Sequence, residues 1–177
     1  RLSSAASDVY KRQFLIKAVK IIIITFIFIP DLSAITKVDK DKKTIINTLE
    51  AHKDRLIEIS DNIWEAAEPA LLEFKSSKYL WDYAEENGFK VTKGVADIPT
   101  AFTAEYGSGR PIIGIMGEFD ANPGISQKKQ PTKEPLVKGA AGHGCGHNLF
   151  GTASLGAAIA IKEMIESGEI SGTVRFY

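Results

Sequence analysis

Residues 148–177 decide the fold class of this chain, and they read NLFGTASLGAAIAIKEMIESGEISGTVRFY. The part from 148 to 167 is rich in Ala and is followed by Gly168, which predicts a helix that ends just before a glycine. Residues 173–177 then begin a strand in which Val174 and Phe176 are expected to face a core. The stretch therefore predicts a helix that leads directly into a strand.

The preceding residues extend this pattern. A helix is expected at 39–67, because Ile45, Leu49, Leu56, Ile59 and Ile63 fall on one face at steps of three and four residues. A second helix is expected at 76–87, with Ser76 or Ser77 as its N-cap and Gly88 just past its end. Strands are expected at 89–91, 101–106 and 111–116, and the last two are joined by a turn at 107–109. A long loop should span 117–141. This order predicts an α/β domain with helices packed on a sheet.

The composition excludes several classes of protein. The 177 residues contain 22 Lys and Arg and 22 Asp and Glu, so the formal net charge is zero and there is no basic footprint for nucleic acid. The single Cys excludes an internal disulfide. The apolar fraction of 44% and the charged fraction of 25% are typical of a folded globular protein.

The first 34 residues differ from the remainder. Residues 14–34, FLIKAVKIIIITFIFIPDLSA, place two lysines before an apolar run that ends at Pro30, which is the layout of a secretory signal peptide. Residues 1–13 resemble a translated adapter sequence and are not expected to belong to the protein. We therefore expect the domain at 35–177 and export to the periplasm or the cell exterior. An uncleaved segment would anchor the protein to a membrane, and an artefactual one would leave it in the cytoplasm.

The densest group of reactive side chains is GAAGHGCGHN, residues 139–148. Residues two apart in an extended segment point the same way, so Cys145 and His147 are placed to share a metal ion, with His143 on the same face. Asn148 is expected to cap the following helix. The alternative is a Gly-rich turn whose histidines make local hydrogen bonds.

Two carboxylates, Glu118 and Asp120, directly follow the strand expected at 111–116. The carboxyl end of a parallel strand is where α/β sheets place their sites. An Asp at this position can orient a metal-binding histidine. The alternative is a solvated pair of loop carboxylates.

These segments resemble a known family. Residues 118–127, EFDANPGISQ, and 142–152, GHGCGHNLFGT, resemble the dinuclear metallo-amidohydrolases of the aminoacylase and carboxypeptidase superfamily, and within it the p-aminobenzoyl-glutamate hydrolase branch. Residues 99–109, PTAFTAEYGSG, and 172–177, GTVRFY, are also similar to that branch. The resemblance covers about residues 45–177 and implies the N-terminal part of a mixed-sheet metallopeptidase catalytic domain.

The resemblance also implies roles for individual residues. Cys145 and His147 match the metal-binding Cys and His of the family, and Asp120 matches its active-site Asp. Three further residues are assigned to the surroundings of the metals, namely Glu118, His143 and Asn148. The implied cofactor is a pair of divalent ions, Zn²⁺ or Mn²⁺.

The implied activity is hydrolysis of the amide bond of N-acyl amino acids or dipeptide-like substrates such as p-aminobenzoyl-glutamate, by a full-length protein that is a homodimer. In the family, a Glu pair that supplies the general base and a metal ligand follows a strand similar to 172–177. We therefore expect this sequence to be a fragment that is inactive alone. Two other functions stay open: an amidase with Cys145 as its nucleophile and His143 or His147 as its base, and an exported binding module without catalysis.

Overall fold

The computed structural model describes residues 32–177, so the expected segment 1–13 and most of the expected signal peptide lie outside the described residues. The chain divides into two units, Arg1–Lys42 and Lys43–Tyr177. Within the described residues, the first unit consists of the beginning of one helix. The elements are α2 (Leu32–Ala66), α3 (Phe74–Glu86), β1 (Lys90–Lys93), the short 3₁₀ helix η1 (Val95–Asp97), β2 (Phe102–Ser108), β3 (Ile112–Ile115), α4 (His147–Glu166) and β4 (Gly172–Phe176).

The four strands form a single mixed sheet in the order β1-β2-β4-β3. β1 pairs with β2, and β2 pairs with β4, in antiparallel orientation, whereas β3 and β4 are parallel. β2 extends to Ser108, so residues 109–111 make the connection to β3, and the turn expected at 107–109 begins too early. The two strands are not neighbours, because β4 lies between them. The chain returns from β3 to β4 through α4, as parallel pairing requires a crossover. The mixed sheet with helices confirms the expected fold class.

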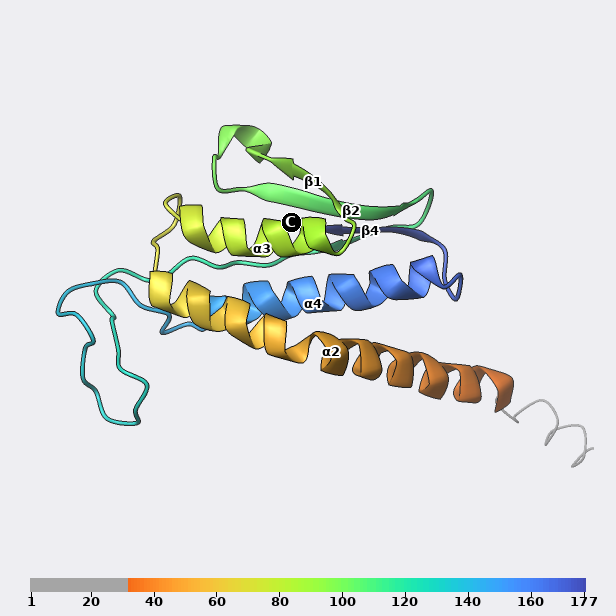
Figure 1. Cartoon of the computed structure of the whole chain (residues 1–177), viewed down its shortest axis with the longest axis horizontal. Helices are drawn as coiled ribbons and strands as arrows, with labels where there is room; N and C mark the ends of the chain where they lie inside the picture. Colours follow the sequence, from red (N-terminus) through yellow and green to blue (C-terminus); the bar gives the residue numbers. More distant parts are fainter. Residues whose placement is uncertain (1–31) are drawn as a thin grey trace, which may run out of the picture. The chain divides into compact units, whose positions relative to one another are not determined.

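The core lies between the helices and one face of this sheet. α3 packs against β1 and β2, and α4 packs against the three strands β2, β3 and β4 (Figure 1). Alternate residues of β4, Val174 and Phe176, are completely buried against Leu155 and Ile159 of α4 and Ile63 of α2. Burial of these side chains is what selects the register of the strands, since a shift by one residue would expose them.

The other sheet face is polar, with Thr103, Glu105 and Arg175 side by side on neighbouring strands.

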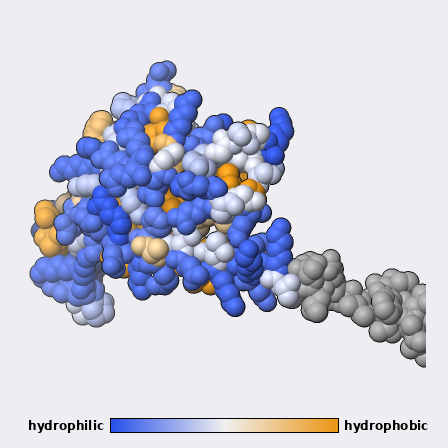
Figure 2. All heavy atoms as spheres, turned by 45° about the vertical axis from the view of Figure 1, so that its right-hand side comes forward, coloured by the Kyte–Doolittle hydropathy of each residue, from blue (hydrophilic) through white to orange (hydrophobic). Residues whose placement is uncertain are grey.

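On the face of the molecule drawn in Figure 2, hydrophilic side chains predominate and apolar ones form small patches. Among the described residues, no helix combines the length and apolar composition needed to cross a membrane.

The helix boundaries differ from expectation at their N-terminal ends. α2 begins at Leu32 rather than at 39, and α3 begins at Phe74, so Ser76 and Ser77 lie inside α3 and are not its N-cap. The Glu68 carboxylate instead accepts hydrogen bonds from the backbone N–H of Lys75 and of Ser76 and from the Ser76 hydroxyl, at 2.8–3.0 Å. A carboxylate at this end also interacts favourably with the helix dipole.

Candidate metal centre

His147 lies between two carboxylates at the start of α4. Its Nδ1 is 2.8 Å from Asp120 Oδ1, and its Nε2 is 3.3 Å from Glu118 Oε2. One potential ligand atom from each of these three residues lies within 4.8 Å of the other two. Both carboxylates follow β3, whose carboxyl end meets the first turn of α4, so the crossover connection brings the two sequence motifs together.

The hydrogen bond to Asp120 determines which ring nitrogen of His147 can bind a metal. An ionised carboxylate can only accept, so Nδ1 carries the hydrogen in this pair. Nε2 is then left with a lone pair on the side of Glu118. Exposure of the side chains rises from 19% at His147 and 25% at Asp120 to 49% at Glu118. Asp120 is thus placed to orient the imidazole, and the more exposed Glu118 is placed to share an incoming ion with Nε2.

Two backbone bridges hold the segment that carries Asp120. Ala121 N–H donates to the Glu68 carbonyl at 2.8 Å, beside a bridge between Pro69 and Ala121. Asn122 and Gly142 exchange two hydrogen bonds of 3.0 Å. These bonds connect the loop after β3 that carries Glu118 and Asp120, called the carboxylate loop below, to the Gly-His-Gly-Cys-Gly-His loop. A Cβ at position 142 would lie 2.6 Å from the Ile125 carbonyl oxygen, so the bridge requires a glycine there.

A close contact between α4 and the carboxylate loop positions Glu118. A Cβ on Gly151 would lie 2.9 Å from the Glu118 carbonyl oxygen and 3.1 Å from Phe119 Cβ. Gly151 is itself buried in α4. The absence of a side chain there lets the loop rest directly on the helix backbone.

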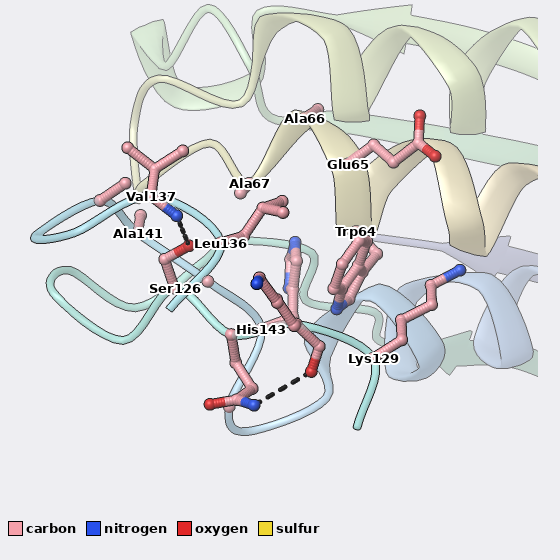
Figure 3. A pocket seen from close by; sticks show the side chains of 15 residues that line it. Trp64, Glu65, Ala66, Ala67, Ser126, Lys129, Leu136, Val137, Ala141 and His143 are labelled. Carbon is pink, nitrogen blue, oxygen red and sulfur yellow. Dashed lines mark hydrogen bonds between the residues drawn. The ribbon is translucent and has the colours of Figure 1, made fainter. Parts of the chain in front are cut away.

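His143 lies outside the cluster of His147, Asp120 and Glu118. Its Nε2 donates to the Ile63 carbonyl of α2 at 3.1 Å, while Nδ1 is buried and has no hydrogen-bond partner among residues 32–177. Burial lowers the pKa of His143, so the neutral ring is favoured. His143 lines a cavity of about 330 Å³ together with Trp64 and with Gly142 and Gly144 of the Gly-rich loop. Figure 3 shows His143 and Trp64 among the lining side chains.

Cys145 and Asn148 also differ from the arrangement that the motif predicts. Cys145 is exposed and lies outside the group of His147, Asp120 and Glu118. Asn148 does not cap α4, because the residue at the cap is Gly146 with a φ of 83° and no side-chain hydrogen bond. The buried Asn148 amide donates instead to Ser60 Oγ at 3.1 Å, which ties α4 to α2. Because Gly146 occupies the cap position, the Asn148 side chain can make this hydrogen bond to Ser60.

The three clustered side chains fit a divalent metal ion. One imidazole with an oriented tautomer and two carboxylates form a mixed nitrogen and oxygen donor set, which suits several first-row metals. Sequence reasoning missed Glu68, whose side chain and carbonyl hold both α3 and Ala121. No local pattern marks it, because its partners lie seven, eight and more residues away.

Comparisons with known proteins agree with this interpretation. No family profile matches the chain. It is 46% identical over 136 residues to one of the subunits of p-aminobenzoyl-glutamate hydrolase from Escherichia coli, an alignment that covers 75% of this chain and 28% of the relative. It is 26% identical over 148 residues to an Xaa-Arg dipeptidase of Mus musculus, over 78% of this chain and 31% of the relative. The chain thus spans about a third or less of these curated relatives.

Two solved structures are also similar. An aminohydrolase from methicillin-resistant Staphylococcus aureus matches with a TM-score of 0.62 and 25% identity, over 76% of this chain and 33% of the other. The YXEP protein of Bacillus subtilis, a dinuclear metal-binding peptidase of the M20 family, matches with a TM-score of 0.59 and 28% identity, over 72% and 35%. The mixed sheet and the clustered metal-binding side chains agree with these similarities. The chain therefore belongs to the metallo-amidohydrolase family that includes p-aminobenzoyl-glutamate hydrolase and the M20 peptidases.

Proposed function

We propose that this chain is part of an enzyme that uses two divalent ions to hydrolyse the amide bond of N-acyl amino acids or dipeptide-like substrates, with p-aminobenzoyl-glutamate as the first candidate. The observation that carries the proposal is His147, held by Asp120 with its Nε2 turned toward Glu118. The relatives support the class of reaction, since both named curated relatives act on amide bonds or dipeptides.

The chain's own residues prepare the site for the metal. Asp120 accepts the Nδ1 hydrogen of His147 and so keeps the ring in one tautomer and one orientation. Glu118 supplies a second oxygen donor on the solvent side. A divalent ion bound here would polarise the amide carbonyl and lower the pKa of a water molecule.

The proposal also concerns how many metal ligands the described residues supply. The three side chains that cluster among the described residues do not provide the ligands of two metal sites, and they cannot serve as the general base while they bind metal. We therefore propose that the 177-residue chain binds metal but is inactive by itself. From the resemblance to the family we also propose that the full-length protein is a homodimer. Export through residues 14–34 is part of the same proposal.

A cysteine-nucleophile amidase receives no support from the contacts of the described residues. Both nitrogens of His147 face carboxylates, and His143 Nε2 faces a carbonyl. The remaining nitrogen, His143 Nδ1, is buried, whereas Cys145 is exposed, and the described residues show no hydrogen bond between Cys145 and either histidine.

Metal content and chelation test the proposal. The 177-residue chain should retain Zn²⁺ or Mn²⁺ after desalting, measured by mass spectrometry of the metals, and His147→Ala should lose it, whereas His52→Gln, which replaces a histidine outside the site, should not. In the full-length protein, hydrolysis of p-aminobenzoyl-glutamate should stop with EDTA. Activity that survives EDTA and is abolished by iodoacetamide would overturn the metal mechanism in favour of Cys145.

A further inference from the structure

A second cavity adjoins the metal centre on the side away from the Gly-rich loop. Its volume is about 280 Å³, and its walls come from the turn before α3, the segment around η1, the start of β2 and the loop after β3. Glu118 and Asp120 belong both to its wall and to the metal centre. A molecule in this cavity would thus lie next to a bound ion. The volume is at the small end of ligand sites, so it suits one side group of a substrate.

The wall combines apolar surface with negative charge. Leu71, Ile98 and Phe119 contribute apolar surface, and the charged side chains among the lining residues are carboxylates, with no Lys, Arg or His. While Glu118 and Asp120 carry no metal ion, an anionic group would be repelled here, whereas an apolar or aromatic group with a positively charged donor would be attracted.

Glu73 is the buried acceptor of this cavity. It is 8% exposed, and Thr100, at 3%, donates its hydroxyl to Glu73 Oε2 at 2.7 Å. Thr100 is the only hydrogen-bond partner of this carboxylate among the described residues, so the carboxylate can accept further hydrogen bonds. A buried carboxylate against apolar walls is a strong acceptor for an ammonium group.

The rim of the cavity holds backbone conformations that side chains rarely adopt. Leu71 has a φ of 68°, Ala96 of 55° and Asp97 of 60°. Leu71 lines the cavity, and Ala96 and Asp97 lie between its lining residues Val95 and Ile98. Strain of this kind in non-glycine residues is concentrated at ligand-binding sites.

We propose that this cavity is a specificity subsite that binds an apolar or aromatic side group carrying an ammonium or amine, with Glu73 as its acceptor, and excludes carboxylates. The inference rests on the proposed function in so far as the side group belongs to the amide substrate. Binding itself requires neither metal nor catalysis, so it can be tested separately.

The test compares two probes with the same ring and opposite charge, benzylammonium and benzoate, on the metal-free 177-residue chain. Amide resonances of Leu71, Ile98 and Phe119 are followed by NMR titration. Benzylammonium should bind about tenfold more tightly than benzoate, the difference expected from one charge-assisted hydrogen bond. Equal affinities, tighter binding of benzoate, or shifts confined to residues outside the cavity would overturn the proposal.

Two substitutions distinguish binding of the ammonium group by Glu73 from its general attraction to the negative charges of Glu118 and Asp120. Glu73→Gln keeps an oxygen that can accept the Thr100 hydroxyl and should abolish most of the preference for benzylammonium. Glu50→Gln makes the same change on the exposed surface of α2 and should leave it unchanged. An unaltered preference in Glu73→Gln would exclude Glu73 as the acceptor. If that variant does not fold, the comparison of the two probes on the unmodified chain decides. Retention of metal with failure of probe selectivity would overturn only the subsite.

Discussion

Asp120 shows how one side chain can control a metal site through its neighbour. Besides offering an oxygen to the ion, it makes a 2.8 Å contact with Nδ1 that decides which nitrogen of His147 carries the lone pair. Asp120→Asn keeps the shape and removes the negative charge. We expect it to weaken Zn²⁺ binding by about 10- to 100-fold, as is typical for partners of a metal-binding histidine.

The measurement is a competitive titration with a metal-sensitive dye. Asp61→Asn is a matched control, because Asp61 is an exposed carboxylate whose ion-pair partner is Lys129. Unchanged affinity in Asp120→Asn would show that the orientation of the ring does not depend on this charge.

A second polar cluster links α2, α3 and α4 far from the metal centre in sequence. The Thr48 hydroxyl donates to Glu163 Oε2 at 2.7 Å, and His52 lies between Tyr83 Oη at 2.5 Å and Glu163 Oε1 at 3.2 Å. Burial by itself raises the pKa of Glu163, but the hydrogen bonds from Thr48 and His52 outweigh it, so the pKa lies below its usual value. His52 is therefore a structural residue, as its apolar neighbours in the sequence indicate.

This pKa has a direct consequence for stability. A carboxyl whose pKa is lowered by folding stabilises the protein above the unfolded pKa and loses that contribution as pH falls through the folded pKa. Thr48→Val should raise the pKa of Glu163 and lower the free energy of unfolding at neutral pH on the order of 1 kcal/mol. The loss should shrink toward pH 3. Urea unfolding at both pH values measures it, with the exposed-strand variant Thr92→Val as control. A loss independent of pH would contradict the role of Glu163.

At the scale of elements, α4 is built to receive the carboxylate loop. Alanine favours a helix over glycine by about 1 kcal/mol. The Cβ added in Gly156→Ala would meet only the movable ends of two side chains, Leu56 and Leu49, so this variant should be neutral or stabilising. Gly151→Ala meets backbone at 2.9 Å and should be destabilising by about 1–3 kcal/mol. Thermal unfolding of the pair measures the difference. Equal changes in melting temperature for the two variants would show that the loop carrying Glu118 can move to accommodate a Cβ at position 151.

Glu68 also connects two elements, because its side chain binds the N-terminus of α3 and its backbone carbonyl binds the segment after β3. Glu68→Ala removes an acceptor of three hydrogen bonds at the helix start and should cost about 1 kcal/mol, the usual value of a cap. Hydrogen exchange should speed up in the first turn of α3. Glu86→Ala, at the opposite end of the same helix, should not have this effect. Protection that is unchanged in Glu68→Ala would contradict the capping role.

For the whole molecule, metal binding should be coupled to folding. The cluster brings together residues from a loop and a helix that are 27 positions apart, and the unfolded chain cannot hold them at these distances. Saturation at 100 times the dissociation constant should therefore stabilise the chain by about 2.7 kcal/mol. Differential scanning fluorimetry with Zn²⁺ or Mn²⁺ should show a rise in melting temperature that EDTA reverses and His147→Ala lacks. A rise that persists in His147→Ala would place the metal elsewhere.

The amino-acid sequence was sufficient for the fold class and for the order of the helices and strands. These depend on local patterns, such as apolar periodicity in α2 and the glycine after α4. Helix starts were less predictable. Ser76 has the chemistry of a cap, but the Glu68 carboxylate, eight residues earlier, satisfies the same backbone groups from a distance.

What the sequence by itself determined is which side chains are available for metal binding and on which elements they lie. Only the tertiary structure decided that His147 joins Asp120 and Glu118, that His143 turns to Ile63, and that Glu73 lines a cavity beside them. The physical reason is that spacing in sequence determines direction only within a regular element. Across loops rich in glycine, the direction of a side chain depends on long-range packing and hydrogen bonds, which no local pattern encodes.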